Sequence, residues 1–177
     1  MKLHIGCGKK FLPGYKHIDV INYDHIDFVC DTRKLLPIEN ESITEIYACH
    51  ILEHVKRDEV LEVLKEWHRT LLPQGTIRIA VPDFEAVVSE YSINKNLKSF
   101  LGLLYGGQTY DYNYHHMCFD FDLLQNLLSE VGFTNIKRYD WKDFLPEDYD
   151  DFSKAYLPHM DFENGRSMSL NIVAEKK

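Results

Sequence analysis

The sequence predicts a single α/β domain built on a mostly parallel sheet. Short apolar runs that are typical of strands alternate with amphipathic helical segments along 177 residues, and such alternation implies parallel strands joined by crossovers. Hydrophobic residues make up 45% of the chain and charged residues 27%, which excludes wholesale disorder. We therefore expect residues 1–177 to fold as one domain around one core.

Seven short apolar runs are expected to be strands, because each is bounded by turn residues or acids. They are Lys2–Gly6, Lys16–Val20, Ile26–Cys30, Ile43–Cys49, Thr76–Val81, Thr134–Asp140 and Ser167–Glu175. Only nine and five residues separate the first three, whereas a parallel crossover normally needs a dozen or more, usually in a helix. We therefore expect the early helices to be reduced or missing.

Four segments carry apolar residues at helical spacing. The first follows Asp58 and ends near Pro73 and Gly75, and the third covers about Asn96 to Tyr105. Asp83 is expected to cap the second helix and Asp122 the fourth, which Gly132 closes. The expected buried stripes are Val60, Leu64, Trp67 and Leu71 in the first helix, Phe84, Val87, Val88 and Tyr91 in the second, and Leu123, Leu124, Leu127, Leu128 and Val131 in the fourth.

Charge and composition exclude several classes of partner. The net charge of −8 disfavours general nucleic-acid binding, because phosphates would be repelled. No apolar run approaches the ~20 residues that a membrane span needs, and the first residues are typical of a strand rather than a secretory signal. The cysteines, Cys7, Cys30, Cys49 and Cys118, lack metal-binding or redox spacing, so we expect reduced thiols in a cytoplasmic protein. The sequence does not indicate an oligomeric state.

A glycine turn follows the first predicted strand. Gly6-Cys7-Gly8 lies where open α/β sheets bind ligands, at the carboxyl ends of the strands. Phe11 occupies the third glycine position of the dinucleotide pattern, and no helix fits before Lys16. Because a pyrophosphate needs the amides of a helix N-terminus, NAD and FAD are disfavoured. S-adenosylmethionine, which joins a nucleoside to an amino acid without a phosphate, fits this turn better.

Two acids end the next two strands. Asp19 can accept hydrogen bonds from the vicinal hydroxyls of a ribose. Asp31 can accept from an adenine amino group, and the Thr32 amide can meet a ring nitrogen. Taken together, acids at the same end of successive strands favour a nucleoside pocket.

With these residues the chain resembles the class I S-adenosylmethionine-dependent methyltransferases, in particular a short branch similar to methyltransferase type 11. The resemblance covers most of the chain and is loosest over 141–166. It is carried by LHIGCG (3–8), HIDV (17–20), CDTRKLLPIENESI (30–43), CHILEHV (49–55), EVLKEWHRTLLPQGTIRIAVPDF (62–84), LYGGQ (104–108), HHMCFD (115–120), LLSEVGF (127–133) and SLNIVAEK (169–176).

The resemblance implies a Rossmann-like sheet of seven strands in the order 3-2-1-4-5-7-6, with the last strand antiparallel. It implies S-adenosylmethionine as cofactor, with its ribose on Asp19, its adenine on Asp31 and Thr32, and its sulfonium beside His50. The cofactor-binding residues implied are Ile5, Gly6, Cys7, Gly8, Asp19, Val20, Asp31, Thr32 and His50.

The segment His50-Ile51-Leu52-Glu53-His54 also fits the H-x-x-E-H pattern of inverted zinc peptidases. That chemistry requires both histidines on one helical face, with the glutamate as base. A strand-like run leads straight into His50, and the strongest helix start lies later, at Asp58. A zinc peptidase is therefore a minor alternative, and no metal ligand is assigned.

Candidate catalytic residues are His115, His116 and Asp83, of which the histidines titrate near neutrality and suit a general base. Tyr105 and Gln108 flank Gly106-Gly107 and are candidates for substrate contact. The expected function is methyl transfer to a small acceptor, such as the hydroxyl of a saccharide or metabolite, with specificity in the loops 106–119 and 141–166. A methyltransferase-like module that binds the cofactor without turnover is the alternative.

Overall fold

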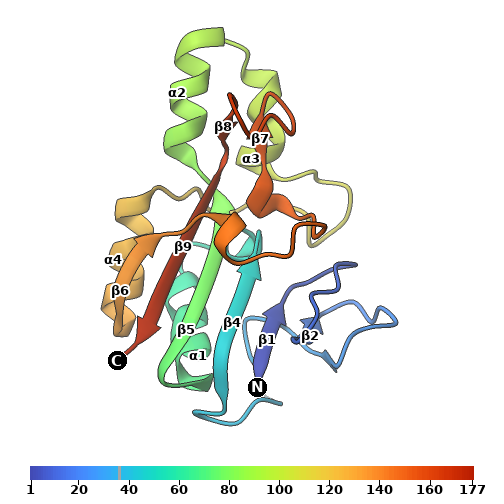
Figure 1. Ribbon diagram of the computed structural model, residues 1–177, viewed down its shortest axis with the longest axis vertical. Coiled ribbons are helices and arrows are strands. Elements are labelled where there is room, and N and C mark those ends of the chain that lie inside the picture. Colours follow the sequence, from blue (N-terminus) through green and yellow to red (C-terminus); the bar gives the residue numbers. More distant parts are fainter. Residues whose placement is uncertain (36) are drawn as a thin grey trace.

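The computed structural model describes residues 1–35 and 37–177, and its centre is a seven-stranded sheet (Figure 1). The strand order is β3-β2-β1-β4-β5-β9-β6. Neighbouring strands pair in parallel except β9, which is antiparallel to both β5 and β6. The strands are β1 (Lys2–Ile5), β2 (Lys16–Asp19), β3 (Phe28–Val29), β4 (Ile43–Cys49), β5 (Leu71–Pro82), β6 (Phe133–Arg138) and β9 (Ser169–Lys176). The predicted order, and the reversal of the last strand, are confirmed.

Two helices cover one face of this sheet. They are α1 (Val60–Thr70) and α4 (Phe121–Val131), which lie behind the strands in Figure 1. Trp67, Leu64 and Leu128 are fully buried there with Leu3 and Ile5 of β1. Because side chains alternate across a strand, the intervening His4 and the β4 residue Tyr47 must find their packing on the other face.

Asp83 caps α2 (Phe84–Asn94) and Gly132 closes α4 as predicted, but the N-terminal caps of α1 and α4 differ from the prediction by one or two residues. α1 begins after Glu59 without a side-chain cap, so the cap expected at Asp58 is wrong. At α4 the cap is Asp120, whose Oδ1 accepts from the Leu123 amide at 2.9 Å, not Asp122. Any acid within a turn of a helix start satisfies the same pattern, and the backbone selects the residue whose conformation is extended.

The early connections contain no α-helix in residues 6–35 and 37–42, as expected. The face they leave open is covered instead by the 141–166 segment, which crosses the front of the strands in Figure 1. The segment includes the short 3₁₀ turns η3 (Trp141–Asp143) and η4 (Phe152–Lys154) and the hairpin of β7 (Tyr156–Leu157) and β8 (Arg166–Ser167). Its buried residues Trp141, Leu145 and Tyr149 form an aromatic cluster with Leu12 and Tyr47.

A third group of elements projects beyond the carboxyl edge of the sheet. It consists of α2 (Phe84–Asn94), the 3₁₀ turn η2 (Leu97–Phe100) and α3 (Leu101–Tyr105), at the top of Figure 1. The stripe predicted for α2 is wrong in part, because only Val87 of its four residues is buried. The helix extends past the sheet, so Phe84, Val88 and Tyr91 remain 41%, 50% and 40% exposed.

None of the helices in the described part of the chain is long and apolar enough to cross a bilayer.

The cover over the open sheet face can be tested at Trp141. This side chain is 9% exposed and packs against Phe162 and the Lys154 ammonium. Removing a large buried aromatic ring typically costs about 3–5 kcal/mol, so Trp141→Ala should lower the free energy of unfolding in urea by that amount. Met160→Ala, at an exposed position of the same segment, should cost under about 1 kcal/mol. Equal stability of the two variants would show that the segment does not cover a core.

Burial of His4 beneath the 141–166 segment should make the stability of the fold depend on pH. Burial lowers the pKa of His4 to about 3, and the neighbouring His17 and His25 add to the shift. Between about pH 3 and 6.5 the unfolded chain binds a proton at His4 that the folded chain does not, so stability falls as the pH falls, by up to about 1.4 kcal/mol per pH unit. In urea titrations His4→Leu should flatten this dependence, whereas the exposed His159→Leu should not. Parallel pH profiles for wild type and His4→Leu would contradict the assignment.

Candidate functional site

The turn after β1 is held by its backbone and admits only glycine at its first position. Gly6 has φ of +61°, and its amide donates to the Ile18 carbonyl of β2 at 2.7 Å. A Cβ on Gly6 would lie 2.0 Å from Cδ1 of Ile51, which follows β4. Gly8 has φ of +56°, and a Cβ there would meet nothing within 4 Å. The turn is therefore packed against the chain after β4 on one side and open on the other.

Asp19, at the end of β2, is fixed beside this turn. Its Oδ2 accepts from the Gly8 amide at 2.8 Å and its Oδ1 from the Ile21 amide at 2.9 Å. The residue is 7% exposed. A carboxylate offers about four acceptor positions, so two remain for a ligand with vicinal hydroxyls. Val20 follows at a half-buried position, and Ile5 is fully buried beneath the turn.

Cys7, between the two glycines, is a neutral thiol. Burial, reinforced by the charge of Asp19, raises the pKa of Cys7 to about 12. Its Sγ lies 3.8 Å from His25 Nε2. Since a thiol rather than a thiolate is present, Cys7 contributes its backbone and volume to the turn rather than nucleophilic chemistry.

The acid after β3 is already paired. Arg33 Nη2 lies 2.7 Å from Asp31 Oδ2, and Arg33 Nε donates to both oxygens at 3.0 Å. The hydrogen bonds from Arg33 lower the pKa of Asp31. The adjacent Thr32 carbonyl accepts from the buried Trp67 indole at 2.8 Å. An adenine at this position would have to share Asp31 with Arg33, which stands only two residues away in the sequence.

After β4, histidine side chains surround the buried carboxylate of Glu53. Glu53, in the 3₁₀ turn η1 (Leu52–His54), is completely buried, and its Oε1 lies 3.1 Å from His50 Nδ1 and 4.0 Å from His115 Nε2. Burial raises the pKa of the Glu53 carboxyl, but His50, His54 and His115 lower it by more, so this pKa lies below its ordinary value. In the sequence, only the peptidase-like pattern distinguishes Glu53.

His115 and His50 are both held in place around that carboxylate. His115 Nδ1 lies 2.9 Å from the Leu103 carbonyl, and burial lowers the pKa of His115. The neutral ring therefore donates through Nδ1 and leaves Nε2 as an acceptor facing Glu53. His50 has φ of +54°, and its Nε2 lies 3.4 Å from Ser169 Oγ of β9. Because His50 precedes η1 and lies on no helix, the helical face that the H-x-x-E-H peptidase pattern requires is not formed.

The remaining catalytic candidates lie apart from this cluster. His116 is exposed, and only its backbone amide reaches the cluster, donating to the Glu53 carbonyl at 2.8 Å. Asp83 Oδ1 caps α2 by accepting from the Glu85 amide at 3.0 Å, and its Oδ2 lies 3.0 Å from Arg138 Nη1. With both oxygens engaged, Asp83 is suited to fixing α2 and β6 rather than to taking a proton.

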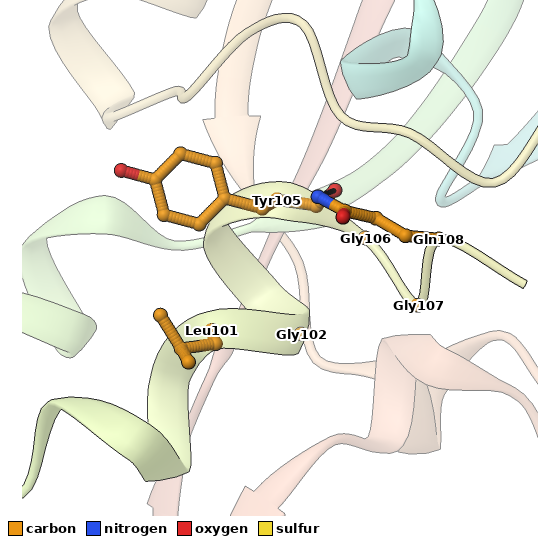
Figure 2. Close-up of a pocket in the computed structure, with 6 residues that line it drawn as sticks. All are labelled: Leu101, Gly102, Tyr105, Gly106, Gly107 and Gln108. Carbon is orange, nitrogen blue, oxygen red and sulfur yellow. Dashed lines mark hydrogen bonds between the residues drawn. The ribbon is translucent and has the colours of Figure 1, made fainter.

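Tyr105 and Gln108 lie on a hollow of about 420 Å³, lined also by Leu101, Gly102, Gly106 and Gly107 (Figure 2). The loop behind it is closed by Asn113, whose carbonyl accepts from the Gln108 amide at 2.8 Å. A Cβ on Gly106 would lie 2.5 Å from that same carbonyl oxygen. The contacts of Asn113 therefore fix the conformation of this loop, which exposes Tyr105 and Gln108 to solvent.

Comparison with known proteins relates part of the chain to a family. Residues 9–79 match a family model described as a methyltransferase domain. A comparison with curated proteins found no match.

Solved structures match the whole chain. It is similar to an S-adenosylmethionine-dependent methyltransferase from Archaeoglobus fulgidus, with a TM-score of 0.58 and 15% identity over 99% of this chain and 85% of that chain. It is also similar to the Burkholderia thailandensis 1,6-didemethyltoxoflavin-N1-methyltransferase with bound 1,6-didemethyltoxoflavin and S-adenosylhomocysteine, with a TM-score of 0.60 and 15% identity over 99% and 70% of the two chains. A third similar structure is an S-adenosylmethionine-dependent methyltransferase from Methanosarcina mazei, with a TM-score of 0.55 and 14% identity over 99% of this chain and 91% of that chain.

The predicted resemblance is thus confirmed: the chain has the class I methyltransferase fold, and part of it matches the methyltransferase domain model.

Proposed function

We propose that this protein transfers a methyl group from S-adenosylmethionine to a small acceptor. The observation that carries the proposal is the carboxyl edge of β1 and β2, where a glycine turn with an open side stands beside the fixed Asp19 carboxylate. This edge follows the strand order of a methyltransferase sheet. The likeness to an enzyme that holds S-adenosylhomocysteine supports the choice of cofactor.

The residues at this edge fit the cofactor. Asp19 keeps two acceptor positions for ribose hydroxyls, and its own orientation is fixed by the Gly8 and Ile21 amides. The side chain of Ile51 closes one side of the Gly6 turn, and His50 stands at the end of β4. Asp31 and Thr32 are assigned to adenine, with Asp31 also hydrogen-bonded to the Arg33 guanidinium.

S-adenosylmethionine, when bound, supplies a methyl group on a sulfonium, whose thioether leaves as a neutral group without acid assistance. The protein has to hold the acceptor atom near ~3 Å from that methyl and exclude water. For a hydroxyl acceptor we assign the general base to His115, because its neutral Nε2 is an acceptor held in one orientation by the Leu103 carbonyl. Glu53 would stabilise the imidazolium once the proton has arrived.

We place the acceptor between the β4 edge and the loop that carries Tyr105 and Gln108. Both side chains offer polar atoms at a hollow of small-molecule size. A saccharide or metabolite hydroxyl suits these partners, because hydroxyl groups can both donate to Gln108 and accept from Tyr105.

Asp19 tests the cofactor site. Asp19→Ala removes the two ribose acceptors and should weaken S-adenosylmethionine binding by about 1–3 kcal/mol, measured by isothermal titration calorimetry. Asp24→Ala, an exposed acid in the next connection, is the matched control and should bind as wild type does. Unchanged affinity in a folded Asp19→Ala protein would remove Asp19 from the pocket.

His115 tests the chemistry. With a labelled methyl donor and a pool of hydroxylated acceptors, His115→Ala should lower turnover by about 10²–10⁴-fold and leave cofactor affinity nearly unchanged. His116→Ala should lower turnover much less, because its ring lies outside the cluster. An equal loss of cofactor affinity in both variants would defeat the base assignment. Cofactor binding without methyl transfer to any acceptor would instead favour a non-catalytic module.

A further inference from the structure

The turn η1 and the loop 106–119 meet at three side chains that could share one ion. Glu53, His54 and His115 each offer a ligand atom, and these atoms all lie within 4.8 Å of one another. They come from segments about sixty residues apart in the sequence, and the backbone joins them where the His116 amide donates to the Glu53 carbonyl at 2.8 Å. The fold therefore builds this constellation independently of the glycine turn.

Both histidines use Nδ1 for a backbone contact, which leaves Nε2 as the nitrogen that could bind a metal ion. His115 Nδ1 lies 2.9 Å from the Leu103 carbonyl, and His54 Nδ1 lies 3.1 Å from the Tyr114 carbonyl. Each ring thus donates its Nδ1 proton to a backbone oxygen, so Nε2 is the nitrogen that remains available to a metal ion. Metal-bound histidines characteristically make this second hydrogen bond, which fixes the tautomer and the ring orientation. The rings stand at 89° with centroids 4.7 Å apart.

The carboxylate between them lacks a hydrogen bond. Glu53 is completely buried, yet neither of its oxygens has a hydrogen-bond partner among the described residues. The nearest histidine nitrogen, His50 Nδ1, lies 3.1 Å from Glu53 Oε1. A buried carboxylate in this condition is costly, and a cation is the partner that offsets the cost most directly.

We propose that Glu53, His54 and His115 form a binding site for a divalent transition-metal ion of the zinc type. One carboxylate and two imidazole nitrogens form a donor set that zinc accepts, and three protein ligands leave a fourth position open. Ligands of a tetrahedral zinc ion at about 2.0–2.2 Å lie roughly 3.4 Å from one another, so side-chain rotations that close each gap by about 1 Å complete the site. His54 is only half-buried and provides the side from which an ion enters.

The site differs from the zinc-peptidase arrangement. In that pattern Glu53 would be the base and His50 a ligand, whereas here Glu53 is a ligand and His50 lies behind it against Ser169. Occupancy would tie the loop 106–119 to the end of β4. It would also use His115 Nε2, the atom that the proposed function assigns to proton transfer, so metal and proton compete for it.

The test is metal binding, which requires no methyl transfer. Chelator-treated full-length protein should bind one equivalent of Zn²⁺ by calorimetry, and one equivalent of Co²⁺ should give the intense visible absorption of a low-coordinate site. His54→Ala and Glu53→Gln should each weaken binding at least about tenfold. His116→Ala, on the same loop but with an exposed ring, should bind as wild type does.

His54→Ala keeps the test valid if Glu53→Gln fails to fold, because His54 is only half-buried whereas Glu53 is completely buried. Absence of stoichiometric Zn²⁺ binding by the wild-type chain would overturn the site. Binding that survives His54→Ala, or that disappears with His116→Ala, would overturn it equally. Neither result bears on S-adenosylmethionine affinity, which separates this proposal from the proposed function.

Discussion

The hydrogen bonds from the Gly8 and Ile21 amides to the Asp19 carboxylate are the interaction on which the proposed binding edge depends. They join the turn after β1 to the end of β2 and fix a nearly buried charge within it. Backbone amides stabilise the carboxylate and hold it in one orientation. The Ile51 side chain, which follows β4, packs directly against Gly6. This short turn therefore sets the relative positions of the ends of β1, β2 and β4.

A second constraint explains how so short a chain completes this fold. The connections around β2 and β3 are too brief for crossover helices, which leaves one face of β1 and β4 without cover. The aromatic 141–166 segment supplies that cover, with Tyr47 donating a 2.5 Å hydrogen bond to Asp151 across it. The segment therefore serves as core as well as loop, and changes there are expected to affect stability before specificity.

The sheet could be predicted because the alternation of strands and helices indicated mostly parallel strands, and the family resemblance implied the strand order that is observed. The helix caps were predicted less well, since Asp58, Asp120 and Asp122 satisfy the same local pattern and only the backbone decides between them. The segment 141–166 was expected to be a loop that contributes to acceptor specificity. Its buried aromatic residues show a packing role that only the missing helices could have indicated.

The site was predicted unevenly for a similar reason. Asp19 and the glycines follow directly from strand ends and could be placed from the sequence. The pairing of Asp31 with Arg33 and the engagement of Asp83 by Arg138 depend on side-chain competition, which no spacing rule describes. The grouping of Glu53 with His115 joins segments far apart in the chain, so no local sequence pattern could indicate it.

The central claim is that the carboxyl edge at Gly8 and Asp19 holds an adenosyl group. It is tested most directly by titrating ¹⁵N-labelled protein with S-adenosylhomocysteine and following amide resonances. The account predicts saturable shifts at the Gly8 and Ile21 amides, which bond to Asp19. If those two signals stay fixed while the ligand saturates resonances elsewhere, or if only a dinucleotide moves them, the account is contradicted.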